Sequence, residues 1–191
     1  MSATKENDYR QTILDVGTKY LYNEKHALFA EDTALKLFDS LATTRSFNEV
    51  ERTLLSHASL LHDIGNCISE KKHHKHSKYL IDHDENLLNY PAKDKNILSL
   101  VAYNHRKKLH KEVELLSKKE KEMVLRLSAI LRIADSLDYT RDEVSIKKVI
   151  LEKLELKITI DGVLPERLND RLLRKKGLFM EIFKLDVTLE V

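Results

Sequence analysis

Apolar residues recur every three or four positions through most of the first 140 or so residues, and this period is typical of amphipathic helices. Asn23 is a suitable N-cap for one helix, and Ser117 with Glu120 three residues later forms a capping-box pattern before another. Gly65 is expected to end a helix, as glycine commonly does. The predicted helices span about residues 9–22, 24–42, 48–64, 74–84, 93–105 and 118–137.

The pattern changes after Arg141. β-branched residues gather at 144–151, and residues 154–160 alternate between apolar and polar side chains, which predicts two strands. Asp161-Gly162 is a turn signal, and it is followed by a predicted helix over about 165–183 and a final strand over 185–191. We therefore expect a mainly α fold, in which a helical-bundle domain (1–142) precedes a small α/β subdomain (143–191).

Composition supports a helical cytoplasmic protein. Of 191 residues, 42% are hydrophobic and only four are Gly and two Pro, which favours helices over disorder. The net charge of +2 is too small to indicate a nucleic-acid or membrane partner. The single cysteine, Cys67, cannot form an internal disulfide, and we expect neither a membrane span nor a signal peptide.

Two histidines and two aspartates predict a metal site. His26, the adjacent pair His62-Asp63, and Asp135 each fall on the apolar face of a different predicted helix. A carboxylate on an apolar face is costly unless it has a partner, and a bound cation would satisfy Asp63 and Asp135 together. Mixed His/Asp ligation suits manganese, iron, zinc or magnesium and does not choose among them.

Two further histidines extend this prediction. His76 shares a predicted helix face with Leu80, and His105 shares one with Val101. They would either complete a second metal position or bind substrate phosphate beside a single ion. The other histidines between His62 and Asp135 are expected at the surface: His73, His74, His83 and His110.

Basic side chains near these ligands are candidates for binding substrate phosphate, because the arginine fork matches phosphate oxygens. Most of the 33 basic residues are expected to be exposed to solvent. Arg132 is expected to be an exception, because it lies in an apolar run. The candidates are Arg106, Lys107, Arg132 and Arg141.

The ordered ligands resemble the His…His-Asp…Asp pattern of the HD superfamily of metal-dependent phosphohydrolases. More closely, the segments 73–81, 103–107, 131–138 and 178–183 resemble the C-terminal part of the exopolyphosphatase / guanosine pentaphosphate phosphohydrolase (Ppx/GppA) family. The resemblance covers about residues 24–191. Members of that family usually begin with a two-lobed actin-like domain, which this sequence does not match. The resemblance therefore implies a stand-alone HD domain with a complete ligand set, without the polyphosphate chemistry.

We expect a phosphohydrolase that cleaves a phosphomonoester, phosphodiester or phosphoanhydride of a nucleotide-like small molecule through a metal-activated water. Asp63 and His62 would be catalytic, with Asp63 both a ligand and a proton acceptor. The alternative is a regulatory module that senses nucleotides or polyphosphate, with the His/Lys-rich segment 71–78 gripping the polyanion. Nucleic-acid binding through residues 106–108 and 174–176 is disfavoured by the low net charge. The α/β subdomain either covers the pocket or forms a homodimer interface.

Overall fold

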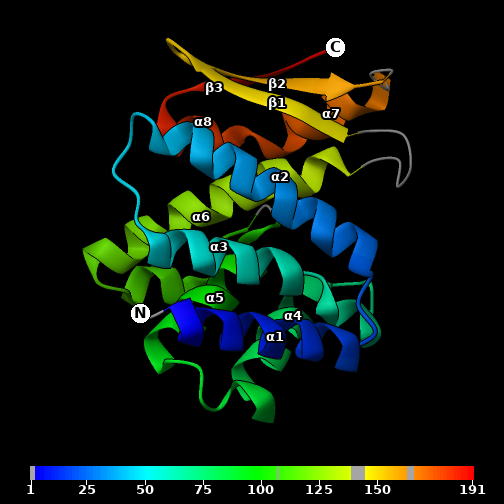
Figure 1. The fold of residues 1–191 in the computed structure, drawn as a ribbon, viewed down its shortest axis with the longest axis vertical. Coiled ribbons are helices and arrows are strands. Elements are labelled where there is room, and N and C mark those ends of the chain that lie inside the picture. Colours follow the sequence, from blue (N-terminus) through cyan, green and yellow to red (C-terminus); the bar gives the residue numbers. More distant parts are fainter. Residues whose placement is uncertain (1–2, 107, 139–144, 163–165) are drawn as a thin grey trace.

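The computed structural model describes residues 3–106, 108–138, 145–162 and 166–191. It confirms the mainly α fold with a small α/β part at the C-terminus (Figure 1). The helices of the first part are α1 (Ala3–Lys19), α2 (Glu24–Ala42), α3 (Glu49–Leu61), α4 (His73–His83), α5 (Ala92–Asn104) and α6 (Lys118–Leu137). Short 3₁₀ turns lie between them at Ile64–Cys67, Glu85–Leu87 and Lys111–Leu115.

Both predicted helix caps are confirmed. The Asn23 side chain accepts a hydrogen bond from the backbone N–H of His26 at the start of α2. At the start of α6, Ser117 and Glu120 form the reciprocal capping box. These caps satisfy backbone N–H groups that have no partner inside the helix, and they set where each helix begins.

Gly65 does not end α3 as predicted, because α3 stops at Leu61 and Gly65 lies within the following 3₁₀ turn. Its role is close packing against α4. A Cβ at this position would lie 2.2 Å from the His73 carbonyl oxygen and 2.4 Å from the Ser77 nitrogen, and the Gly65 N–H donates to the Ser77 hydroxyl at 2.9 Å. The absent side chain therefore lets α4 approach the end of α3.

The C-terminal part is a three-stranded sheet with two helices. Strand β1 (Ser145–Glu152) pairs antiparallel with β2 (Glu155–Asp161), and β2 pairs in parallel with β3 (Asp186–Glu190). The parallel pair needs a long crossover, which is supplied by α7 (Glu166–Lys175) and α8 (Gly177–Phe183). The single helix predicted for this segment is wrong, because a turn at Lys176 divides it just before Gly177, a poor helix former.

The sheet lies over α8 and α2 at one end of the molecule, and α1 lies at the other (Figure 1). Ile146, Leu156 and Phe179 belong to the same buried cluster as the apolar faces of the helices. The predicted division at residue 142 falls outside the described residues and stays a prediction. No helix within the described ranges is both long and apolar enough to cross a bilayer.

Candidate metal centre

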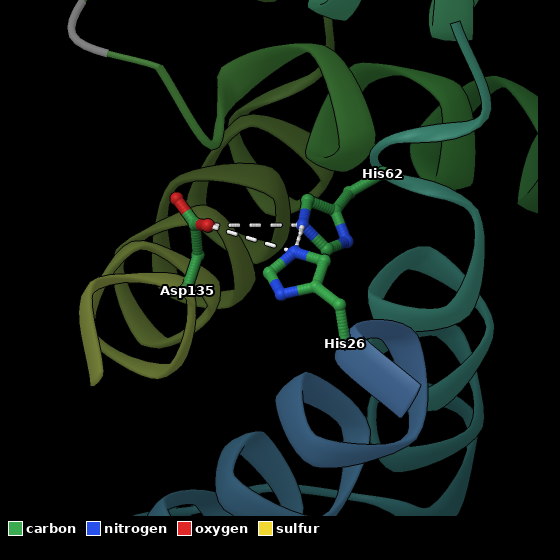
Figure 2. A group of neighbouring side chains, drawn as sticks. All are labelled: His26, His62 and Asp135. Carbon is green, nitrogen blue, oxygen red and sulfur yellow. Dashed lines mark hydrogen bonds and ion pairs between the residues drawn. The ribbon is translucent and has the colours of Figure 1, made fainter. Parts of the chain in front are cut away.

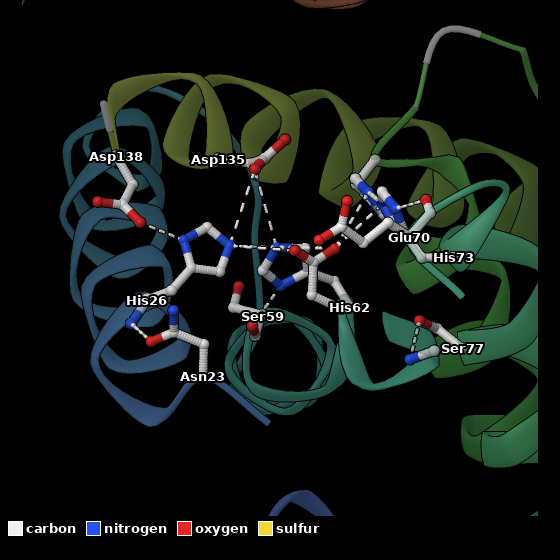
Figure 3. A network of polar contacts seen from close by, with 12 residues as sticks. Asn23, His26, Ser59, His62, Glu70, His73, Ser77, Asp135 and Asp138 are labelled. Carbon is white, nitrogen blue, oxygen red and sulfur yellow. Dashed lines mark hydrogen bonds and ion pairs between the residues drawn. The ribbon is translucent and has the colours of Figure 1, made fainter. Parts of the chain in front are cut away.

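One end of each helix from α2 to α6 lies at a common site in the bundle, where the candidate metal ligands meet (Figure 3). α3, α5 and α6 arrive by their C-terminal ends, which carry partial negative charge and favour a cation. α2 and α4 arrive by their first turns. The side chains gathered there are His26 at the start of α2, His62 and Asp63 just after α3, His73 at the start of α4, His105 just after α5, and Asp135 near the end of α6.

The four imidazoles share one hydrogen-bonding pattern. The Nδ1 atoms of His62, His73 and His105 lie 2.7, 2.9 and 2.6 Å from the carbonyl oxygen three residues earlier in the chain, in Ser59, Glu70 and Ala102. A carbonyl oxygen only accepts, so each Nδ1 carries the proton and each Nε2 presents a lone pair. The fourth imidazole, His26, donates from Nδ1 to the Asp138 carboxylate (Figure 3).

The Nε2 atoms face one another in two pairs. Those of His26 and His62 are 3.0 Å apart, and those of His73 and His105 are 2.9 Å apart. Figure 2 shows His26, His62 and Asp135 pointing toward a common centre from three helices. Two lone pairs at such a distance repel each other unless a proton or a metal ion lies between them, and this arrangement is therefore suited to a cation.

Two carboxylates complete the centre. Oδ1 of Asp135 lies 3.9 Å from Nε2 of His26 and 3.8 Å from Nε2 of His62. Asp63 faces both histidine pairs: its Oδ1 lies 3.2 Å from Nε2 of His73 and 3.5 Å from that of His105, and its Oδ2 lies 3.5 Å from Nε2 of His26. Oδ1 of Asp63 is buried and makes no hydrogen bond.

Among the residues that the structure describes, potential ligand atoms within 4.8 Å of one another form two groups. One contains His26, His62 and Asp135, and the other contains Asp63, His73 and His105. Because the carboxylate of Asp63 faces both histidine pairs, it lies between the two groups.

The protonation states follow from this geometry. Burial alone would lower the pKa of His26, but its hydrogen bonds to Asp138 and Asp63 raise that pKa to about 10. Burial would raise the pKa of Asp63 and of Asp135, yet the imidazoles around both, and Lys175 beside Asp135, hold each pKa well below its usual range. Burial holds the pKa of His105 well below its usual value. The centre thus combines two carboxylates with one protonated imidazole, a proton that a metal ion would displace.

The structure brings together five of the six residues predicted as metal ligands: His26, His62, Asp63, Asp135 and His105. His73, expected at the surface, occupies the position that the sequence analysis assigned to His76, and His76 belongs to neither group. The reason is that α4 begins at His73, which shares the buried face of that helix with Ser77 and Ile81 at intervals of four. The sequence shows this spacing, but it shows the His76–Leu80 spacing equally well, so it does not choose between the two histidines.

A pocket of about 660 Å³ opens beside Asp135. Arg106, which the sequence offers as a phosphate-binding candidate, is one of its lining residues. Besides Asp135, its other lining residues are His74, Lys108, Arg171, Arg174 and Lys175. All of these except Arg171 belong to the segments 71–78, 106–108 and 174–176, which the sequence offers only for the less favoured polyanion and nucleic-acid alternatives. Burial and the neighbouring His73 lower the pKa of His74 to about 4, so its imidazole is neutral near pH 7. Lys107 and Arg141, the other predicted phosphate ligands, lie outside the described residues.

Arg132, also predicted to bind phosphate, does not line this pocket. It is buried, and its Nε donates a hydrogen bond of 2.7 Å to the carbonyl oxygen of Asn104 at the end of α5. Burial lowers its pKa to about 10. Its guanidinium thus donates to a carbonyl group at the C-terminal end of α5, where carbonyl groups lack partners inside the helix. The apolar sequence around Arg132 is compatible with this role and with phosphate binding alike.

Residues 10–177 match the family described as Ppx/GppA phosphatase, domain III. The chain is 31% identical over 167 residues to the guanosine-5'-triphosphate,3'-diphosphate pyrophosphatase of Aeromonas hydrophila subsp. hydrophila, an alignment that covers 86% of this chain and 33% of that protein. It is 30% identical over 168 residues to the protein of the same name from Aeromonas salmonicida, covering 85% and 33%. For the protein of that name from Pseudoalteromonas atlantica the identity is 27% over 151 residues. The chain spans about a third of the length of these curated relatives.

Proposed function

This chain belongs to the Ppx/GppA phosphatase family, and from that premise we propose that it is an HD-type, metal-dependent phosphohydrolase acting on a nucleotide-like phosphate compound. The observation that carries the proposal is the convergence of four imidazole Nε2 atoms on the buried carboxylate of Asp135 and the half-buried carboxylate of Asp63. Each imidazole is oriented by a hydrogen bond at Nδ1, which is how proteins usually prepare histidine as a metal ligand.

The donor set fits one or two divalent ions. Neutral imidazole and carboxylate together suit manganese, iron, zinc or magnesium. The buried Asp63 Oδ1, which has no hydrogen-bond partner, is the kind of atom that a cation would satisfy, and its reach toward both histidine pairs favours two ions over one. A bound divalent cation would supply Lewis-acid activation of a water nucleophile and neutralise charge on the phosphoryl group.

The side chains would divide the remaining work. Asp63 would also accept a proton from the attacking water, through the carboxylate oxygen that the cation leaves free. His62 would keep its Nε2 directed at the centre through its bond to Ser59. Arg106, Lys108 and Arg174 line the adjacent pocket and would hold the substrate's phosphate oxygens.

The names of the relatives indicate a substrate class. Each is called a guanosine-5'-triphosphate,3'-diphosphate pyrophosphatase, so we propose that this chain binds a guanosine phosphate carrying several phosphate groups. The strongly basic lining of the pocket supports this, because each added phosphate brings further negative charge.

A second candidate function rests on the length comparison. Since the chain matches only about a third of each relative and the family match is to domain III, it could act as a regulatory module that binds the nucleotide without hydrolysing it. In that case metal and nucleotide would bind together, but no phosphate would be released.

The test is a phosphate-release assay on protein loaded with manganese or iron, against guanosine polyphosphates, other nucleotides, cyclic nucleotides and short polyphosphates. Asp63→Ala removes the bridging carboxylate, and Asp39→Ala, which removes an exposed carboxylate paired with Arg52, is the matched control. Turnover that disappears in Asp63→Ala and survives in Asp39→Ala supports the enzyme. Metal-dependent nucleotide binding without turnover supports the regulatory module.

A further inference from the structure

The C-terminal subdomain reaches into the metal centre through Lys175. This residue ends α7, and its ammonium lies 2.5 Å from Oδ2 of Asp135 and donates to the carbonyl oxygen of His105 at 3.2 Å. One helical turn earlier, Arg171 donates to the carbonyl oxygen of Asp135 at 3.2 Å. Lys175 and Arg171 of α7 are therefore hydrogen-bonded to residues of the centre, at the end of α5 and in α6.

The sequence of α7 explains this placement. Leu168 and Leu172, seven and three residues before Lys175, are both buried against the core. Since residues three and four apart share a helix face, Lys175 continues the buried stripe and is directed inward rather than to solvent. Its side chain is only 16% exposed, in keeping with this position.

The two oxygens of Asp135 have different partners. Oδ2 is bonded to Lys175, whereas Oδ1 faces the Nε2 atoms of His26 and His62. An aspartate side chain can rotate about χ2, which would exchange these oxygens or turn both away from the histidines. A strong, charge-assisted bond to Oδ2 prevents that rotation.

We propose that Lys175 is a positioning residue that holds Asp135 so that its Oδ1 is presented to a metal ion between His26 and His62. The inference rests on the proposed function, since it concerns the same centre. It makes the C-terminal subdomain part of the site, because the residue that orients one ligand comes from a segment 40 positions further along the chain.

Lys175 also lines the basic pocket, so a phosphate-binding role must be separated from a positioning role. A lysine that only binds substrate phosphate would change KM and leave metal affinity untouched. A positioning residue would change metal affinity in the absence of any substrate. Hydrogen-bond partners of metal ligands typically change metal affinity about 10- to 100-fold when they are removed.

The experiment measures Mn²⁺ affinity by isothermal titration calorimetry, without substrate, for the wild type, Lys175→Met and Lys176→Met. Lys176 is the matched control because it is the next residue, carries the same charge and pairs with Asp186, a residue of β3, at 2.5 Å. Thermal unfolding of the metal-free proteins shows whether each variant is folded. If Lys175→Met does not fold, Lys175→Gln, which keeps a donor and removes the charge, carries the same test.

We expect Mn²⁺ affinity to fall about 10- to 100-fold in Lys175→Met and to stay within about twofold of wild type in Lys176→Met. Unchanged affinity in Lys175→Met, with or without a raised KM, would overturn the positioning role and leave the metal centre standing. Tighter binding would also overturn it, because it would mean that the ammonium competes with the ion. Absence of Mn²⁺ binding by the wild type would overturn the metal centre itself, and the inference with it.

Discussion

The imidazole of His26 donates a hydrogen bond from Nδ1 to the carboxylate of Asp138, which lies 112 residues further along the chain. This bond joins the first turn of α2 to the residue that follows α6, and it directs Nε2 of His26 toward His62 (Figure 3). The other three imidazoles of the centre are oriented by backbone carbonyls, so Asp138 is the side chain whose replacement tests this orientation most directly.

Replacing Asp138 with Ala should weaken metal binding about 10- to 100-fold, because His26 loses the acceptor that sets its ring orientation and tautomer. Asp138→Asn keeps an acceptor oxygen and should lose less. Titration of each protein with Mn²⁺ measures the effect, and Asp15→Asn, which alters an exposed carboxylate on α1, serves as the control. Equal affinities in Asp138→Ala and wild type would contradict the assignment.

The metal-free protein should lose stability as the pH rises from about 6.5 to about 10. His26 has a pKa raised to about 10 in the folded state, against 6.5 for an ordinary histidine, so the folded state binds more protons across this range. The stabilising charge pairing is complete below pH 6.5 and is lost as the pH passes the folded-state pKa. Urea unfolding in the presence of a chelator measures the slope. Asp138→Ala should flatten it, and an unchanged slope would show that another group is responsible.

The two glycine positions Gly65 and Gly177 should respond oppositely to alanine. Gly65→Ala places a Cβ 2.2 Å from the backbone oxygen of His73, which cannot move away cheaply, so we expect a loss of about 1–3 kcal/mol in the free energy of unfolding. Because His73 is displaced, metal affinity should fall as well.

Gly177→Ala meets no atom within 4 Å, and alanine is the better helix former by about 1 kcal/mol, so stability should be unchanged or raised. Denaturant unfolding of both variants makes the comparison. A Gly65→Ala protein as stable as Gly177→Ala would refute the close packing of α4 against the turn at Gly65.

Substitutions of Arg132 and Arg106 should have different effects, the first on stability and the second on substrate binding. Arg132→Met leaves the Asn104 carbonyl without its donor in a buried setting, and we expect about 1–3 kcal/mol less stability. Arg106→Ala, at an exposed pocket-lining position, should leave stability within about 0.5 kcal/mol and raise KM severalfold. Unfolding curves and steady-state kinetics of both variants test the pair. A raised KM in Arg132→Met at unchanged stability would restore its predicted phosphate role.

Most of the helices could be predicted because interactions between residues near one another in sequence determine them. The apolar period predicted the helices, and Asn23 and Ser117 marked the starts of α2 and α6 because capping involves only neighbouring residues. The turn that divides α7 from α8 is not evident from the sequence, since a single glycine after Lys176 weakens a helix only slightly. Gly65 was given the wrong role because its constraint comes from α4, not from its own helix.

Helical phase is a property of local sequence, and it was enough to predict most of the side chains that gather at the centre: His26 and Asp135 lie on inward helix faces, and His62, Asp63 and His105 directly follow such faces. The packing of the helices selects His73 rather than His76, because this choice depends on where α4 begins and how closely Gly65 lets it approach. The same holds for Asp138 and Lys175. Each orients a ligand that is distant in sequence. Hydrogen bonds across such separations depend on how the helices pack, and the local pattern of apolar residues does not reveal them.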